Sequence, residues 1–191
     1  CNPNWFTAEF ASVESALAAA KSASASFMKR WLHMADTVWQ NYVASLESHG
    51  NSTREIWDRQ IGNFWELSWT VSAGETSGVD RKLIRNFPAT VENGTKCSLM
   101  GEYQEISGYF GRGNWAKQRV FWEKLRETVG SYELRDGERL CAIALVKRLF
   151  PRREVEEKSS WPSTSFVAAI PWLNIVARED PEALTSYAQN A

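Results

Sequence analysis

Apolar residues that recur every three or four positions dominate the first third of the chain and constrain its fold most. In an α-helix this spacing places them on one face, and so apolar a face must be covered by other elements. The spacing predicts one long helix, or two in series, from about residue 11 to residue 46, ended by Gly50. The stripe consists of Met28, Trp31, Leu32, Ala35, Val38, Trp39, Tyr42 and Leu46.

Similar patterns predict further helices along the rest of the chain. They are expected at about residues 53–72, 79–86, 114–129, 138–150, 162–178 (interrupted at Pro171) and from residue 181 onward. In the first of these, Trp57, Phe64 and Trp65 contribute to a wide apolar face, which indicates a place in the core or at a subunit contact. In the helix from residue 114, Trp115 is expected among the apolar residues.

Residues 87–113 differ from the rest, because Pro88 and five glycines predict a long loop dominated by turns. The expected fold is therefore mainly α: an irregular helical bundle with a long Gly-rich loop. Residues 1–10 are expected to be an entry segment, and residues 11–191 to form a single helical domain.

Charge and hydropathy exclude several classes of protein. The 22 Lys and Arg residues nearly balance the 23 Asp and Glu residues, so no global field draws the molecule to nucleic acid or to an anionic membrane. No apolar stretch has the length of about 20 residues that is needed to cross a bilayer. The opening residues lack the basic head and apolar run of a secretory signal. With only three cysteines, a reducing, cytoplasmic setting is expected.

Two of the cysteines occupy positions typical of a zinc site that has lost half of its ligands. Structural zinc sites often pair two cysteines three positions apart with a second such pair. Here Cys97 is followed by Met100, and Cys141 by Ala144. A thioether is a poor zinc ligand and a methyl group is none, so zinc binding is not expected. Two isolated cysteines are otherwise most often small buried residues.

A resemblance to a known family supports the idea of a degenerate zinc site. The segments Lys96-Cys-Ser-Leu-Met-Gly-Glu102 and Gly137-Glu-Arg-Leu-Cys-Ala-Ile-Ala-Leu-Val-Lys-Arg-Leu-Phe150 resemble the zinc-binding region of one family, the large signature subunit of type III-B CRISPR–Cas effector complexes. Three short segments agree in order with that family: Asn2-Pro-Asn-Trp-Phe6, Arg54-Glu-Ile-Trp-Asp-Arg-Gln-Ile61 and Trp161-Pro-Ser-Thr-Ser165.

The resemblance implies a structural role in antiviral defence. In that family, two cyclase-like palm domains make cyclic oligoadenylates through a Gly-Gly-Asp-Asp motif, and a helical region between them braces the cyclase core and contacts neighbouring subunits. This chain lacks the motif, and its residues 1–10 resemble the segment that leaves the first palm domain. The resemblance thus implies a helical domain that is not an enzyme, needs no cofactor, and has subunits of the complex and guide or target RNA as partners.

Basic residues on either side of the two cysteines are candidates for contact with RNA phosphates or a neighbouring subunit. The alternative is that Glu138, Glu154 and Glu156 neutralise them. The candidates are Arg81, Lys82, Arg85, Lys96, Lys147, Arg148, Arg152 and Arg153.

Two other classes of protein stay open. The chain begins at Cys1 and has Asn-x-Thr sequons at Asn51 and Asn93, which would suit an exported or lipid-anchored helical binding module. A small enzyme with a site built from unpatterned residues has no positive support, because neither His33 nor His49 belongs to an arrangement of catalytic or metal-binding residues.

Overall fold

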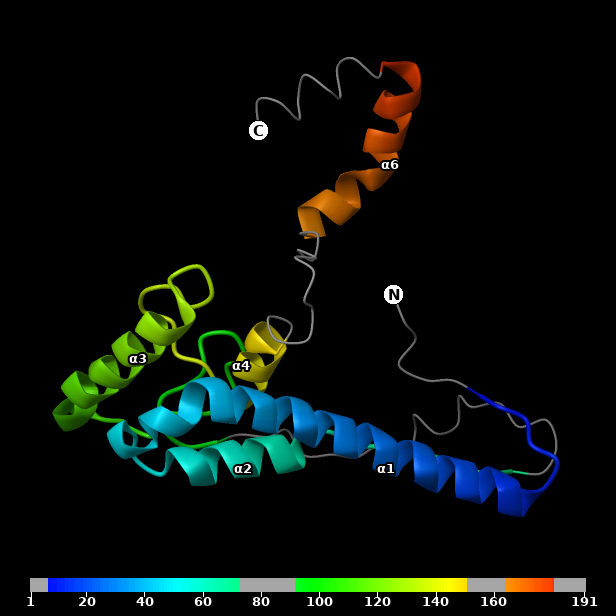
Figure 1. Ribbon diagram of the computed structural model, residues 1–191, viewed down its shortest axis with the longest axis horizontal. Helices are drawn as coiled ribbons and strands as arrows, with labels where there is room; N and C mark the ends of the chain where they lie inside the picture. The colour runs from blue at the N-terminus through cyan, green and yellow to red at the C-terminus, as the bar shows by residue number, and fades with distance from the viewer. Residues whose placement is uncertain (1–6, 73–91, 151–163, 181–191) are drawn as a thin grey trace. The chain divides into compact units, whose positions relative to one another are not determined.

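The computed structural model describes residues 7–72, 92–150 and 164–180 (Figure 1). The chain groups into two compact units, Cys1–Glu154 and Val155–Ala191, each of which is considered by itself. The predicted mainly helical class is confirmed. In the described ranges the only β-type pairing is an isolated antiparallel bridge between Lys96 and Gln104. That residues 11–191 form a single domain stays a prediction.

The predicted long helix is present as α1, Val13–Val38. It begins at a capping box, in which Ser12 and Ser15 each accept a hydrogen bond from the other's backbone N–H. The chain then winds on through a π-helical turn, Trp39–Val43, and a 3₁₀ segment, Ala44–His49. The predicted end at Gly50 is therefore confirmed.

The apolar stripe of α1 faces the core of the first unit over its second half. Its buried members include Trp31, Ala35 and Val38, and the Trp31 indole N–H donates to the Ile61 carbonyl at 2.9 Å. Burying a side chain as large as that of Val38 contributes about 1.5–3 kcal/mol. Leu32 is an exception to the prediction, since 48% of its surface is exposed.

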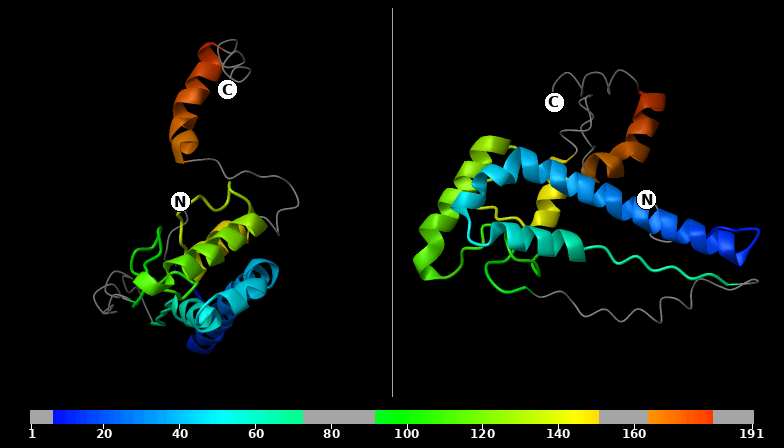
Figure 2. Two further views of the ribbon diagram at one scale, coloured as in Figure 1. Left: turned by 90° about the vertical axis from the view of Figure 1, so that its left-hand side faces the viewer. Right: turned by 60° about the horizontal axis from the view of Figure 1, so that its bottom comes forward.

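The second helix, α2, spans Thr53–Asn63 and is shorter than the predicted 53–72. Gly62 and Asn63 are weak helix formers, and the Asn63 side-chain amide donates to the Arg59 carbonyl at 2.9 Å. After them, the chain runs back along α1 toward its N-terminal end, as both figures show (Figures 1 and 2).

Aromatic contacts with α1 hold the segment after Asn63 along this helix. The rings of Phe64 and Trp65 lie 5.6 and 5.9 Å from that of Trp31. Trp57 and Phe64 lie in or against the core, as predicted, whereas Trp65 is 39% exposed. The apolar spacing beyond residue 63 thus comes from packing of a non-helical segment.

Helix α3 spans Trp115–Val129, at the predicted place. Asn114 precedes it but does not cap it through its side chain, which donates instead to the Phe110 carbonyl at 3.1 Å. Trp115 is 66% exposed, so its predicted place on the apolar face is wrong. The first three residues of α3 are exposed, and its buried apolar residues begin at Phe121.

Helix α4, Ala142–Leu149, is the most enclosed of the described helices. It packs against α1 and α2, and six of its eight residues are buried. The predicted start at residue 138 is wrong. The backbone just before α4 bonds to the long loop, with the Ile106 N–H donating to the Leu140 carbonyl at 3.1 Å.

In the second unit, α6 spans Thr164–Glu179 and contains Pro171, close to the predicted helix with its interruption. Ile170, Trp172 and Ile175 are exposed. The helices expected at residues 79–86 and from residue 181 lie outside the described residues. None of the described helices combines the length and the apolar character needed to span a bilayer.

Candidate functional site

The Cys97 segment folds into a tight loop closed by backbone hydrogen bonds. The Cys97 N–H donates to the Tyr103 carbonyl at 2.8 Å, and the Tyr103 N–H donates to the Met100 carbonyl at 2.8 Å. Inside the loop, the Met100 N–H points at the Cys97 Sγ, 3.4 Å away. The loop therefore holds the Cys97 sulfur beside a backbone N–H that can stabilise negative charge on it.

A second segment brings Cys141 to this loop. The Ser98 N–H donates to the Arg139 carbonyl at 2.7 Å, and the Arg139 N–H donates back to the Ser98 hydroxyl at 2.9 Å. Cys141 then occupies the N-cap position of α4, with its Sγ 3.7 Å from the Met100 Sδ. A zinc site at these positions would require the two cysteine segments to lie together, and in the structure they do.

The two thiols are buried, with Cys97 3% and Cys141 0% exposed. Hydrogen bonding from the Cys141 thiol, with backbone donors from Cys141, Leu99 and Met100, lowers the pKa of Cys97 to about 6 against the effect of burial. The same hydrogen bonding, together with burial, raises the pKa of Cys141. The pair therefore releases its first proton from Cys97.

The donor set does not fit structural zinc, which usually has four Cys or His ligands. Met100 and Ala144 stand where the other two ligands would be, and Ala144 is a buried residue of α4. Across the described ranges, no three His, Cys, Asp or Glu side chains gather in a way that could hold a metal ion. Direct hydrogen bonds and packing join the two segments instead.

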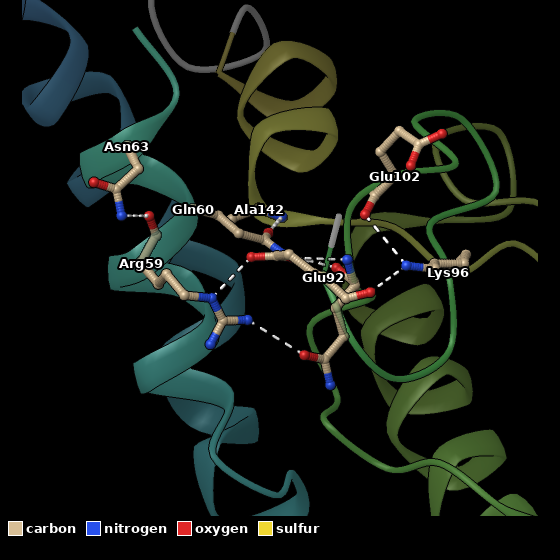
Figure 3. A network of polar contacts seen from close by, with 8 residues as sticks. Arg59, Gln60, Asn63, Glu92, Lys96, Glu102 and Ala142 are labelled. Carbon is tan, nitrogen blue, oxygen red and sulfur yellow. Dashed lines mark hydrogen bonds and ion pairs between the residues drawn. The ribbon is translucent and has the colours of Figure 1, made fainter. Parts of the chain in front are cut away.

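A polar network ties both segments to α2 (Figure 3). The Gln60 side-chain carbonyl accepts from the Ala142 N–H, the first of α4, at 2.8 Å. Its amide donates to Glu92 at 2.6 Å and to the Gln104 carbonyl at 2.8 Å. Arg59 pairs with Glu92 at 2.8 Å. Gln60 thus fixes the start of α4 and the loop that carries Cys97.

An open hollow of about 370 Å³ lies over this network. Arg59, Gln60, Glu92 and Gln104 in its wall hydrogen-bond to one another, so their polar groups already have partners. The hollow therefore presents a neutralised surface in place of a charged binding pocket.

Glu105 is a fully buried carboxylate that sequence reasoning missed. It accepts hydrogen bonds from the Ser107 N–H and hydroxyl at 2.8 and 2.6 Å, from the Trp122 indole at 2.8 Å and from Gln118 at 3.2 Å. Burial raises its pKa despite these donors. Glu105 joins the long loop to α3.

Helical spacing could have revealed one of these buried polar residues. Gln60 lies three positions after Trp57 and one before Ile61, so it belongs to the buried face of α2. No spacing signal marks Glu92 or Glu105, because both lie in the irregular loop.

Of the eight basic candidates, the structure describes three, and each has a partner within the chain. The Lys96 ammonium bonds to the carbonyls of Glu92 and Glu102. Lys147 lies over the Phe64 ring, 4.9 Å from its centroid, and Arg148 pairs with Glu138 at 2.7 Å. The other five, Arg81, Lys82, Arg85, Arg152 and Arg153, lie outside the described residues.

The expected neutralisation by Glu138 is thus seen at Arg148. Glu154 and Glu156, named with it, lie outside the described residues, and contact of the basic group with RNA stays a prediction.

Comparisons with protein-family models, curated proteins and solved structures return no match for this chain.

Proposed function

We propose that this chain is a structural and interaction domain of the large subunit of a type III CRISPR effector complex, a cytoplasmic antiviral defence machine. The observation that carries the proposal is the contact of the Cys97 loop with Cys141 at the start of α4. A two-loop zinc region that lost two ligands would keep this pairing only if other interactions held it. The Ser98–Arg139 and Gln60–Ala142 hydrogen bonds supply such interactions.

In this role the domain acts through rigidity. Gln60, buried in α2, links the loop and α4, while Glu105 links the loop to α3. Fully satisfied buried polar networks of this kind favour a single arrangement of the elements they join. A domain of fixed shape can brace neighbouring palm domains and present constant surfaces to other subunits, with no catalytic group of its own.

Contact with a subunit is favoured over contact with RNA in the part of the chain that the structure describes. Lys96, Lys147 and Arg148 are engaged within the chain, so a phosphate would have to displace an existing partner. An RNA contact would then rest on basic residues other than these three.

The test is to purify the protein that carries this chain from its own cells through a chromosomal affinity tag, and to sequence the RNA and identify the proteins that accompany it. The proposal expects short RNAs that share one repeat-derived end and differ in the rest, together with a fixed set of protein subunits. An unrelated cytoplasmic protein with the same tag is the control. Recovery without such RNA, or in the membrane fraction, contradicts the proposal.

A further inference from the structure

Three sulfur atoms meet where the Cys97 loop touches α4. The Cys141 Sγ lies 3.7 Å from the Met100 Sδ, and the Met100 N–H donates to the Cys97 Sγ at 3.4 Å. Both thiols are buried, whereas Met100 is partly exposed and the neighbouring Leu99 is 57% exposed. The cluster therefore lies just below the surface, with the thioether on its outer side.

The spacing of two of these sulfurs suits a metal ion held by three ligands. An ion about 2.3 Å from each of three sulfurs in one plane separates them by about 4 Å. The 3.7 Å between Cys141 and Met100 is close to that edge. On this edge, little movement of the loop would be needed to admit an ion.

We propose that Cys97, Met100 and Cys141 form a three-sulfur site for the soft monovalent cation Cu(I). Thiolates and thioethers are soft ligands that select Cu(I), and hard or borderline ions prefer imidazole, carboxylate or a full set of thiolates. In the described part of the chain no further His, Cys, Asp or Glu side chain completes a cluster here. The same replacement, Met100 for cysteine, that disfavours zinc thus favours a softer ion.

Cu(I) offsets one of the two thiolate charges of this site. Binding one Cu(I) leaves both thiols deprotonated, with their protons in solvent, and the two thiolates, one neutral thioether and one Cu(I) carry a net charge of −1. The copper does not change its oxidation state. The Met100 N–H already donates to the Cys97 Sγ at 3.4 Å, and Cys141 stands at the N-terminus of α4, where negative charge is stabilised.

The test uses the full chain with Cys1→Ser, so that only the two site cysteines remain. The reduced protein is given one equivalent of Cu(I) or of Zn(II) without oxygen, desalted, and analysed for metal. A chromogenic Cu(I) chelator then competes for the ion to give its affinity. We expect one copper per chain, near-ultraviolet absorption from sulfur-to-copper charge transfer, and no retained zinc.

Met100→Leu is the decisive variant, because it keeps the size of the side chain and removes only the thioether. We expect its Cu(I) affinity to fall at least about tenfold, a loss that even residues outside a ligand shell can cause. Met34→Leu, at another partly buried methionine packed on the core, is the matched control and should leave the affinity unchanged. Cys97→Ser and Cys141→Ser should each abolish retention, with circular dichroism to check folding.

Any of three results would overturn the proposal: no copper retained by the parent chain, the same affinity in Met100→Leu as in Met34→Leu, or zinc held as firmly as copper. Because Met100→Leu preserves packing, it decides the matter even if a cysteine variant fails to fold. These outcomes are independent of the RNA recovery that tests the proposed function.

Discussion

Gln60 makes polar contacts with three residues outside α2 although it is almost fully buried. Its carbonyl accepts from Ala142 in α4, and its amide donates to Glu92 and to the Gln104 carbonyl. A polar side chain in the core is tolerated when all its groups are paired, and its loss exposes every partner to an apolar surrounding.

Replacing Gln60 with Leu, which has a similar size, should therefore lower the stability of the fold through the loss of hydrogen bonds. We expect the free energy of unfolding to fall by about 2–3 kcal/mol, because the Ala142 N–H and the Gln104 carbonyl lose their partner. Urea denaturation measures this. Gln40→Leu, at an exposed position, is the control and should change stability by no more than about 0.5 kcal/mol. Equal effects of the two substitutions would contradict the role of Gln60.

Glu105 should make stability depend on pH. Its pKa is raised in the folded state by burial, so above pH 4.5 the unfolded chain loses this proton more readily than the folded one. Its contribution is then full below the unfolded pKa and is lost as pH rises through the folded pKa.

The measurement is the free energy of unfolding between pH 4 and pH 8 for the wild type and Glu105→Gln. We expect the stability of the wild type relative to the variant to decrease as pH rises, because the variant has no proton to lose at this position. Glu127→Gln, exposed on α3, should keep the wild-type slope. If the stability of the wild type relative to Glu105→Gln instead increased with pH, the hydrogen-bond donors around Glu105 would outweigh the effect of its burial.

At the scale of elements, periodicity predicted most of the helices but not all of their ends. In α1 the apolar spacing, the capping box and Gly50 agree, so the predicted helix was found. In α2 the aromatic residues after Asn63 continue the helical spacing, although their rings pack on α1 from a non-helical segment. Sequence patterns record which side chains are buried, and only tertiary contacts decide the backbone that buries them.

Glycines in different settings should respond in opposite ways to an added methyl group. Gly62 lies exposed in α2 with open space around its missing Cβ, so Gly62→Ala should raise the free energy of unfolding by about 0.5–1 kcal/mol. Gly108 has a φ of +73°, and a Cβ there would lie 1.6 Å from the Asn51 carbonyl oxygen. Gly108→Ala should therefore destabilise by more than about 1 kcal/mol. Thermal denaturation of both variants tests the pair, and a gain of stability in the second would contradict the loop geometry.

At the scale of the molecule, the described apolar core belongs to the first unit alone. Its buried cluster runs from Trp31 to Phe150. The fold class followed from helical periodicity, and the meeting of Cys97 with Cys141 followed from a resemblance of motifs. The contacts of Gln60 with Glu92, and of Glu105 with Trp122, could not be predicted in the same way, since Glu92 and Glu105 lie in a loop with no regular spacing.

A chain limited to residues 1–154 should therefore fold as a cooperative unit. We expect its midpoint of urea unfolding to lie close to that of the full chain, because the whole of the described core is retained. A chain that stops at residue 137, which lacks α4, serves as the control and should not unfold cooperatively. Loss of the transition in both would mean that residues after 154 are needed for folding.

The position of α4 near the end of the first unit also affects how the protein is made. Trp31 and Trp57 emerge from the ribosome long before α4, the helix against which α1 and α2 pack. At 5–20 residues per second, translation of the roughly 90 residues that separate Trp57 from the end of α4 takes about 5 to 20 s. For that time the nascent chain carries a tryptophan-rich surface without its cover, which makes it a natural client for chaperones that bind growing polypeptides.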